Sequence, residues 1–321
     1  MHMEKVLNSY IDYYSLQKAP FGITPNIDFY CDFRGQEDIV ADMIFALDNG
    51  DAFVKVTGEA GVGKTLLMWR LLADIGDQFH TCVFSSNDFS AEGLWQGVAE
   101  NLGVAFQNYT PTRLIDKLAE KLLQLQQEGR RMLIVIDEAQ ALTDDALDAL
   151  RFLLNMETQH AKLLQVVIFA QPSIDDRLHS VTFESLRQRI SLSISMGPLQ
   201  AKELNDYLCH RLLVAGHPSG RLFTESAQKQ LFALSQGIPR IVNILCGKAL
   251  LLSYQRGLPY VDINEIQHCM KSCQEMLAMQ CVPKRTSIIL TRMIRALCIF
   301  FIGVCCGFVY NNVTHTLFIG T

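Results

Sequence analysis

Up to about residue 196, the chain alternates between short apolar runs and longer segments with helical periodicity. Four apolar runs rich in β-branched and aromatic residues predict buried strands at residues 51–57, 80–84, 132–136 and 164–170. A run that alternates between apolar and polar residues predicts a fifth strand at residues 190–195. The helical segments between them are residues 66–75, 90–102, 111–127 and 143–159. Strands separated by helices are typical of an α/β fold with a parallel sheet, which we expect here.

Beyond Gly197 the strand signals end and only helical periodicity remains. The predicted helices are residues 200–215, 224–235, 240–254 and 262–279. Asp262 and Glu265 form a capping-box pattern at the start of the last helix. We therefore predict an α/β domain over residues 1–197 and a helical domain over residues 198–280.

The C-terminal tail, residues 284–321, differs in kind from the rest. Residues 296–310 carry no charge, but a helix of that length spans about 22 Å, less than the roughly 30 Å hydrocarbon core. Extending it to residues 293–313 adds one charge, Arg295, near the end where a long side chain reaches the interface. We predict a transmembrane helix over about residues 293–313. An apolar helix packed on protein is the alternative.

Charge and composition narrow the class of protein. With 49% hydrophobic residues and 9 Pro among 321 residues, the chain is expected to fold around a core rather than to be disordered. The net charge of −5 includes a basic flank before the apolar segment, which predicts a cytoplasmic body and an outward tail. The remainder is more acidic still, which argues against nucleic acid as a partner.

The ten cysteines do not indicate a disulfide scaffold or a zinc site. The N-terminal residues have no apolar signal-peptide run, so we expect the body in a reducing cytosol. Cys269, Cys273 and Cys281 cluster in sequence, but the paired CxxC half-sites of structural zinc are missing. We predict ordinary thiols.

A phosphate-binding loop is the strongest chemical signal in the chain. The segment GEAGVGKT fits GxxxxGK[ST] and lies between a predicted strand and a predicted helix. Its residues are Gly58, Glu59, Ala60, Gly61, Val62, Gly63, Lys64 and Thr65. Backbone N–H groups would surround the β-phosphate, Lys64 would contact the β- and γ-phosphates, and the Thr65 hydroxyl would bind Mg²⁺.

Two adjacent acids, Asp137 and Glu138, follow the most apolar strand. We predict that Asp137 holds Mg²⁺ through its water shell and that Glu138 polarises the attacking water, provided that this strand lies beside the phosphate loop. A solvated acidic loop is the alternative. Gln171 ends the strand at 164–170, where its amide is placed to reach the γ-phosphate or the water. No guanine-reading NKxD segment is present, so the predicted cofactors are ATP and Mg²⁺, with GTP as the disfavoured alternative.

Three arginines are candidates for completing the site. Arg187 and Arg189 precede the fifth strand, where one of them would project into a neighbouring subunit's nucleotide site as an arginine finger. Arg240, in the segment GIPR, opens a helix of the second domain and would contact the γ-phosphate. The alternative for all three is an ordinary surface arginine.

These residues together resemble the AAA+ ATPases, with Walker A at 58–65, Walker B at 133–138, sensor 1 at Gln171, fingers at Arg187 or Arg189, and sensor 2 at Arg240. More narrowly, residues 10–275 are similar to the ExeA/general secretion pathway protein A family, and within it to the MSHA pilus biogenesis members. The stretches that carry this resemblance are 19–26 (APFGITPN), 137–140 (DEAQ), 162–167 (KLLQVV), 186–190 (LRQRI) and 220–224 (GRLFT).

The resemblance implies an ATPase that assists assembly of a type IV pilus or type II secretion complex at the bacterial inner membrane. It implies a cytoplasmic ATPase domain, a helical lid, a single membrane pass, a ring-type homo-oligomer and inner-membrane assembly proteins as partners. It also places residues 20–26 near the nucleotide base. ExeA-type members continue past the membrane into a peptidoglycan-binding domain, whereas few residues follow the predicted span here. We therefore do not expect direct peptidoglycan binding.

Two other functions remain open at this point. A DNA-directed AAA+ ATPase of the transposition-helper or replication-initiation type shares the same core, although the acidic body and apolar tail argue against it. A nucleotide-gated scaffold that binds ATP with little turnover is the other alternative, and the observation that distinguishes it is whether Glu138→Gln changes anything beyond turnover.

Overall fold

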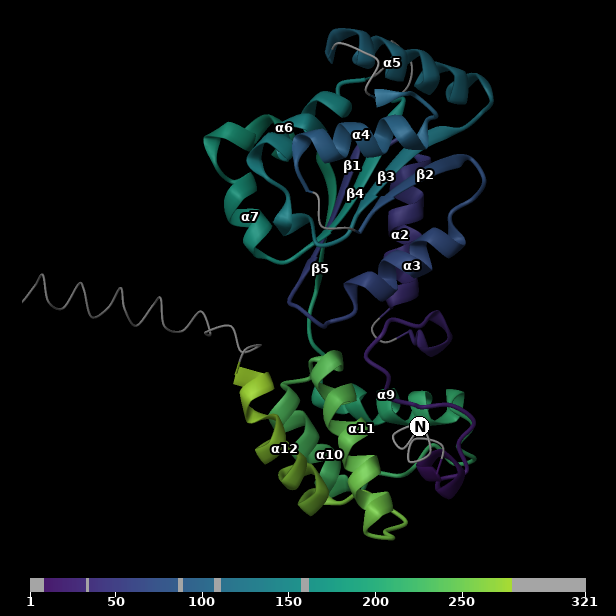
Figure 1. The fold of residues 1–321 in the computed structure, drawn as a ribbon, viewed down its shortest axis with the longest axis vertical. Coiled ribbons are helices and arrows are strands. Elements are labelled where there is room, and N and C mark those ends of the chain that lie inside the picture. The colour runs from purple at the N-terminus through teal and green to yellow at the C-terminus, as the bar shows by residue number, and fades with distance from the viewer. Residues whose placement is uncertain (1–8, 33–34, 86–88, 107–110, 157–161, 279–321) are drawn as a thin grey trace, which may run out of the picture. The chain divides into compact units, whose positions relative to one another are not determined.

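The computed structural model describes residues 9–32, 35–85, 89–106, 111–156 and 162–278 (Figure 1). Residues 1–272 form one compact unit and residues 273–321 a second. The predicted membrane span at 293–313 lies outside the described residues. Within them, no helix is both long and apolar enough to cross a bilayer. The predicted domain boundary near Gly197 stays a prediction.

A five-stranded parallel sheet in the order β2-β3-β4-β1-β5 confirms the expected α/β fold. The strands are β1 (Phe53–Gly58), β2 (Phe79–Phe84), β3 (Arg131–Ile136), β4 (Leu164–Ala170) and β5 (Ile190–Met196). Each lies within two residues of its predicted bounds. β1 is an interior strand, since Val54 pairs with Val167 on one side and Leu192 on the other. β4 therefore lies between β1 and β3, the strand that carries the Walker B residues.

Helices cover both faces of the sheet, which explains why its inner strands β3, β4 and β1 are almost entirely buried (Figure 1). On one face, α2 (Gln36–Asp48) and α3 (Lys64–Asp74) pack against alternate residues such as Val56 and Val135. On the other, α4 (Ala91–Asn101), α5 (Pro111–Gln127) and α6 (Asp144–Leu153) pack against Ile134 and Val166. The edge strand β5 instead alternates between half-buried and exposed residues over most of its length.

Local signals account for most helix starts. The hydroxyls of Ser90 and Thr143 each accept a hydrogen bond from a backbone N–H in the first turn of α4 and α6. α6 is shorter than the predicted 143–159 and ends at Leu153. We did not predict α2 or the short helices α7 (Ser173–Leu178) and α8 (Glu184–Arg187), nor the single turns η1 (Ile27–Phe29), η3 (Ala139–Ala141) and η4 (Val181–Phe183).

After β5 the described chain is helical apart from one isolated bridge between Phe223 and Val261. The helices are α9 (Ala201–Val214), α10 (Glu225–Ser235), α11 (Pro239–Gln255) and α12 (Ile263–Ala278). Their bounds agree with the four predicted helices to within a residue or two. Glu265 accepts a hydrogen bond from the backbone N–H of Asp262, as half of the predicted capping box. The Asp262 carboxylate also accepts from the hydroxyls of Thr224 and Ser226.

Candidate functional site

The phosphate loop lies between the end of β1 and the start of α3, as the sequence predicted. Two of its glycines, Gly61 and Gly63, have φ values of 85° and 109°, which residues other than glycine rarely adopt. A Cβ added at Gly58 would lie 2.8 Å from the carbonyl oxygen of Met196. The loop therefore needs glycine at these positions, and it delivers backbone N–H groups to the N-terminus of α3, which favours an anion.

Lys64 is the first residue of α3 and is 4% exposed. Its Nζ donates hydrogen bonds to the carbonyl oxygens of Gly58, at 2.9 Å, and Glu59, at 3.1 Å. Burial lowers the Lys64 pKa below the ordinary lysine value of 10.5, and the carboxylates of Glu138 and Asp137 act in the opposite direction. The ammonium group is thus held within the loop, close to the acids that follow β3.

Thr65 and Asp137 are in contact although the strands that precede them, β1 and β3, are not neighbours in the sheet. The Thr65 hydroxyl donates to Asp137 Oδ2 over 2.7 Å, and Asp137 is only 6% exposed. A hydroxyl and one carboxylate, with waters and phosphate oxygens completing the octahedron, are ligands that Mg²⁺ takes in nucleotide sites. In the described ranges no group of three or more His, Cys, Asp or Glu residues forms a ready-made metal site. These oxygens therefore fit Mg²⁺ delivered together with phosphate.

Glu138 adopts a left-handed backbone conformation, with φ 53° and ψ 37°, that is uncommon for a residue other than glycine. Its backbone N–H donates to Asp137 Oδ1 over 2.9 Å. The Asp137 side chain is thus held by both Thr65 and Glu138, whereas Glu138 itself is exposed. The two adjacent acids therefore have different surroundings, and the roles assigned to them stay predictions.

Gln171 immediately follows β4, between the ends of β1 and β3. Its backbone N–H donates to the side-chain oxygen of Gln140 over 2.9 Å. The Gln140 amide nitrogen in turn donates to the Glu138 carboxylate. Gln140 belongs to the DEAQ stretch after β3, and only the fold brings the end of β4 to this turn.

The structure distinguishes the two finger candidates. The Arg189 guanidinium donates to the carbonyl oxygen of Leu154, at 3.0 Å, and to the side chain of Asn155. Arg187 is exposed at the end of α8, and no hydrogen bond or ion pair of its side chain is found within the described part of the chain. The Arg189 guanidinium is therefore held by contacts within its own chain, whereas the Arg187 side chain extends from an exposed position.

Arg240 lies in the first turn of α11, and its backbone meets the phosphate loop. Its backbone N–H donates to the Gly61 carbonyl oxygen over 3.2 Å. The preceding Gly237 has a φ of 75°, and a Cβ there would lie 2.0 Å from the Leu199 carbonyl oxygen. The GIPR segment is thus packed tightly between the loop and the residues after β5, while the Arg240 side chain remains exposed.

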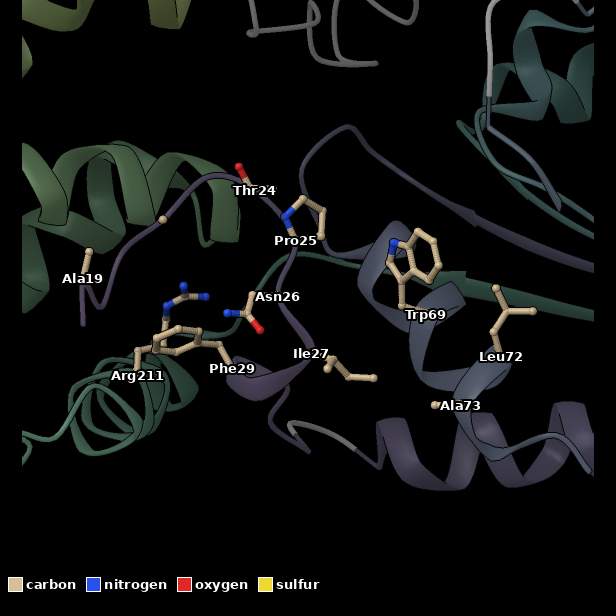
Figure 2. Close-up of a pocket in the computed structure, with 11 residues that line it drawn as sticks. Ala19, Thr24, Pro25, Asn26, Ile27, Phe29, Trp69, Leu72, Ala73 and Arg211 are labelled. Carbon is tan, nitrogen blue, oxygen red and sulfur yellow. The ribbon is translucent and has the colours of Figure 1, made fainter. Parts of the chain in front are cut away.

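Two cavities border this region. The smaller, of about 70 Å³, touches the phosphate loop at Val62 and Gly63 and is also lined by Phe29, Cys31 and Pro239. The larger, of about 770 Å³, is lined by residues of the 19–26 stretch together with Trp69 of α3 and Arg211 of α9. Figure 2 shows the N-terminal segment passing between Arg211 and Trp69.

The resemblance had placed residues 20–26 near the base. The cavity that they line contains no residue of the loop 58–65 in its wall. Phe29 and Cys31, a few residues later, line the smaller cavity, whose wall does include residues of the phosphate loop. The path of the N-terminal segment brings Phe29 and Cys31 to the loop, and no local sequence pattern indicates this.

Comparisons with known proteins agree with this geometry. Residues 47–178 match the AAA domain family. The chain is 31% identical over 249 residues to general secretion pathway protein A of Aeromonas hydrophila, covering 77% of this chain and 45% of that protein. It thus spans less than half the length of this relative.

Two solved structures have a similar fold. Cdc6p from Pyrobaculum aerophilum has a TM-score of 0.57 at 16% identity, covering 76% of this chain and 70% of that one. The ORC1 protein of Aeropyrum pernix, solved in complex with DNA, has a TM-score of 0.58 at 18% identity, covering 79% and 69%. At these identities the likeness concerns the fold alone.

Proposed function

Because this chain carries an AAA domain and is an ATPase related to general secretion pathway protein A, we propose that it hydrolyses Mg-ATP to assist assembly of a pilus or secretion complex at a membrane. The observation that carries the ATPase part is the 2.7 Å contact between the Thr65 hydroxyl and the Asp137 carboxylate beside the Lys64 loop. It joins a phosphate loop to a magnesium-type acid across an intervening strand.

The residues divide the work of hydrolysis. Backbone N–H groups of residues 58–65 bind the β-phosphate, and Lys64 exchanges its contacts to Gly58 and Glu59 for phosphate oxygens. Thr65 and Asp137 would hold Mg²⁺, which would supply positive charge against the phosphate oxygens. Glu138 accepts a proton from, or polarises, the attacking water. Gln171 and Arg240 contact the γ-phosphate from β4 and α11.

The base of ATP is expected in the smaller cavity. Val62, Gly63 and Leu66 form its wall on the side of the phosphate loop, and Phe29 and Tyr207 add aromatic surface. The wall also includes Leu199 and Pro239, on either side of Gly237. A nucleotide there would contact the α/β part and the helices after β5 at once, which is how residues 198–280 would act as a lid.

Completion of the site by a second subunit rests on Arg187. It is exposed and unengaged within the described residues, whereas Arg189 donates to Leu154 and Asn155 of its own chain. We therefore assign the finger to Arg187. A ring-type homo-oligomer follows, because each finger must reach the nucleotide of the next subunit.

The cellular role rests on the relative and on the sequence of the tail. General secretion pathway protein A is 31% identical to this chain, and the apolar segment 293–313 with its basic flank would anchor the ATPase to the cytoplasmic face of the inner membrane. The MSHA-type resemblance favours a type IV pilus as the client. A type II secretion complex, with its inner-membrane assembly proteins as partners, is the alternative client.

The first test is ATP hydrolysis by the full chain in lipid nanodiscs, measured against protein concentration with Lys64→Ala as the blank. We expect specific activity to rise with concentration. Constant activity well above the blank would contradict completion of the site between subunits, and activity equal to the blank would contradict hydrolysis. In the source bacterium, Lys64→Ala should abolish surface pili or secretion, while Arg113→Ala, at an exposed arginine of α5, should not.

A further inference from the structure

Gln140 joins two residues that the proposed mechanism treats separately. Its Nε2 donates to Oε2 of Glu138, and its Oε1 accepts from the backbone N–H of Gln171 over 2.9 Å. One side chain therefore contacts both the acid expected to polarise water and the end of β4.

The orientation of the Gln140 amide follows from its partners. A backbone N–H can only donate, so the Gln140 group facing Gln171 must be the carbonyl oxygen. The NH₂ group then faces Glu138, whose ionised carboxylate can only accept. Hydrogen bonds to a charged acceptor are roughly twice as strong as neutral ones, so this arrangement is favoured over its flipped form.

The backbone of Gln140 is also held in place. It lies in the single turn η3, and the Arg177 guanidinium of α7 donates to the carbonyl oxygens of Gln140, at 3.2 Å, and Leu142, at 2.7 Å. Arg177 also pairs with Asp144 at the start of α6. The Gln140 amide therefore extends from a fixed point. Glu138, in contrast, is exposed, and Gln140 is the partner that the described residues give its carboxylate.

We propose that Gln140 is a positioning residue for ATP hydrolysis, one that orients the Glu138 carboxylate and ties it to the end of β4 beside Gln171. It does not touch the nucleotide and acts through Glu138. The inference rests on the proposed hydrolytic role of Glu138. Its consequence is a selective one: loss of Gln140 slows turnover while nucleotide binding, which uses residues 58–65, is kept.

The size of the effect follows from what misplacement of a general base costs. Displacing a catalytic group by about 1 Å lowers rates by up to about 10²-fold. We expect Gln140→Ala to lower kcat by about 10- to 100-fold and to change KM and the ATP dissociation constant less than twofold. Gln140→Glu keeps the side-chain length and the acceptor for Gln171, but it sets a carboxylate against Glu138 and should lower kcat at least as much.

The deciding experiment is a double-mutant cycle with Glu138→Gln in the full chain in nanodiscs, reading kcat, KM, mant-ATP affinity and Tm. Because Gln140 acts through Glu138, adding Gln140→Ala to Glu138→Gln should lower kcat no further. The matched control is Gln96→Ala, which removes a similar glutamine–glutamate contact, Gln96 to Glu100 at 2.7 Å on α4, and should leave kcat unchanged.

Three results would overturn the inference. They are additive losses in the cycle, equal loss of kcat and ATP affinity in the single variants, or full activity of Gln140→Ala. If Gln140→Ala does not fold, the same double-mutant cycle with Glu138→Gln is measured with Gln140→Glu. Wild-type protein no more active than Lys64→Ala would overturn the proposed hydrolysis itself, and this inference with it, whereas an active wild type separates the two.

Discussion

The backbone N–H of Arg240 donates to the carbonyl oxygen of Gly61 over 3.2 Å, which joins the start of α11 to the middle of the phosphate loop. The two residues are so close that a Cβ added at Gly61 would lie 2.7 Å from the Cβ of Arg240. A change of loop conformation on nucleotide binding would therefore displace the start of α11 directly. This contact provides a physical route from the phosphates to the helices after β5.

Gly61→Ala should disturb this contact and weaken nucleotide binding. The substitution combines a φ of 85° with the close approach to Arg240, and each factor costs about 1 kcal/mol or more. We expect about a tenfold loss of ATP affinity and a lower Tm. Gly103→Ala is the matched control, since Gly103 has a φ of 69° with nothing within 4 Å of an added Cβ. Equal effects of the two variants would show that the Arg240 contact is unimportant.

Nucleotide affinity should depend on pH through Lys64. The protonated ammonium binds phosphate, and burial lowers its pKa below 10.5. ATP affinity should therefore fall as pH rises through this lowered pKa. The free energy of unfolding of the nucleotide-free protein should instead increase with pH up to about 10.5. Lys64 binds its proton more tightly in the unfolded state, so the cost of burying the charged side chain falls as the side chain loses this proton.

The measurement is ATP titration in steps from pH 7 to 10, with parallel urea unfolding. Lys64→Arg, which stays charged over this range, is the control and should show no alkaline loss of whatever affinity it retains. An identical pH profile in the two proteins would mean that Lys64 is not the titrating group.

Thr65→Ala should raise the Mg²⁺ concentration needed for hydrolysis. The Thr65 hydroxyl contacts Asp137 and is a candidate Mg²⁺ ligand, so its loss should weaken metal binding by about tenfold, equivalent to roughly 1.4 kcal/mol. Thr65→Ser keeps the hydroxyl and should behave as wild type. The test is ATPase activity measured against free Mg²⁺ concentration at saturating ATP. An unchanged Mg²⁺ concentration for half-maximal activity in Thr65→Ala would show that Thr65 is not a Mg²⁺ ligand.

Arg187→Ala should lower hydrolysis by about 10³-fold while keeping ATP binding, as expected of an arginine finger. Arg189→Ala should mainly lower stability, by about 1 kcal/mol, because it loses hydrogen bonds to Leu154 and Asn155. Mixing Arg187→Ala with Lys64→Ala subunits should restore part of the activity, since one site per mixed pair is then complete.

The control mixture combines Arg189→Ala with Lys64→Ala and should show no gain beyond dilution. Hydrolysis and mant-ATP binding are measured across mixing ratios. Absence of recovery at every ratio would count against a site shared between subunits, and recovery in the control instead would assign the finger to Arg189.

The sequence by itself determined the sheet, most helices and the phosphate loop, because these depend on local patterns. Continuous apolar runs gave strand positions, and β4 begins and ends at its predicted residues, 164 and 170. The loop and its acids were also identifiable, since Lys64, Thr65, Asp137 and Glu138 follow strands in a recognisable spacing. Helix α2 was missed, although Val40, Met43 and Leu47 have helical spacing.

Only the tertiary structure decided which side chains meet. The strand order separates β3 from β1, yet Thr65 reaches Asp137, and no local pattern encodes that distance. The contacts of Gln140 with Gln171, of Arg189 with Leu154, and of Arg240 with Gly61 join residues far apart in sequence. Such contacts arise from the packing of whole elements against one another, so the roles proposed for Gln140 and Arg187 could be inferred only from the folded chain.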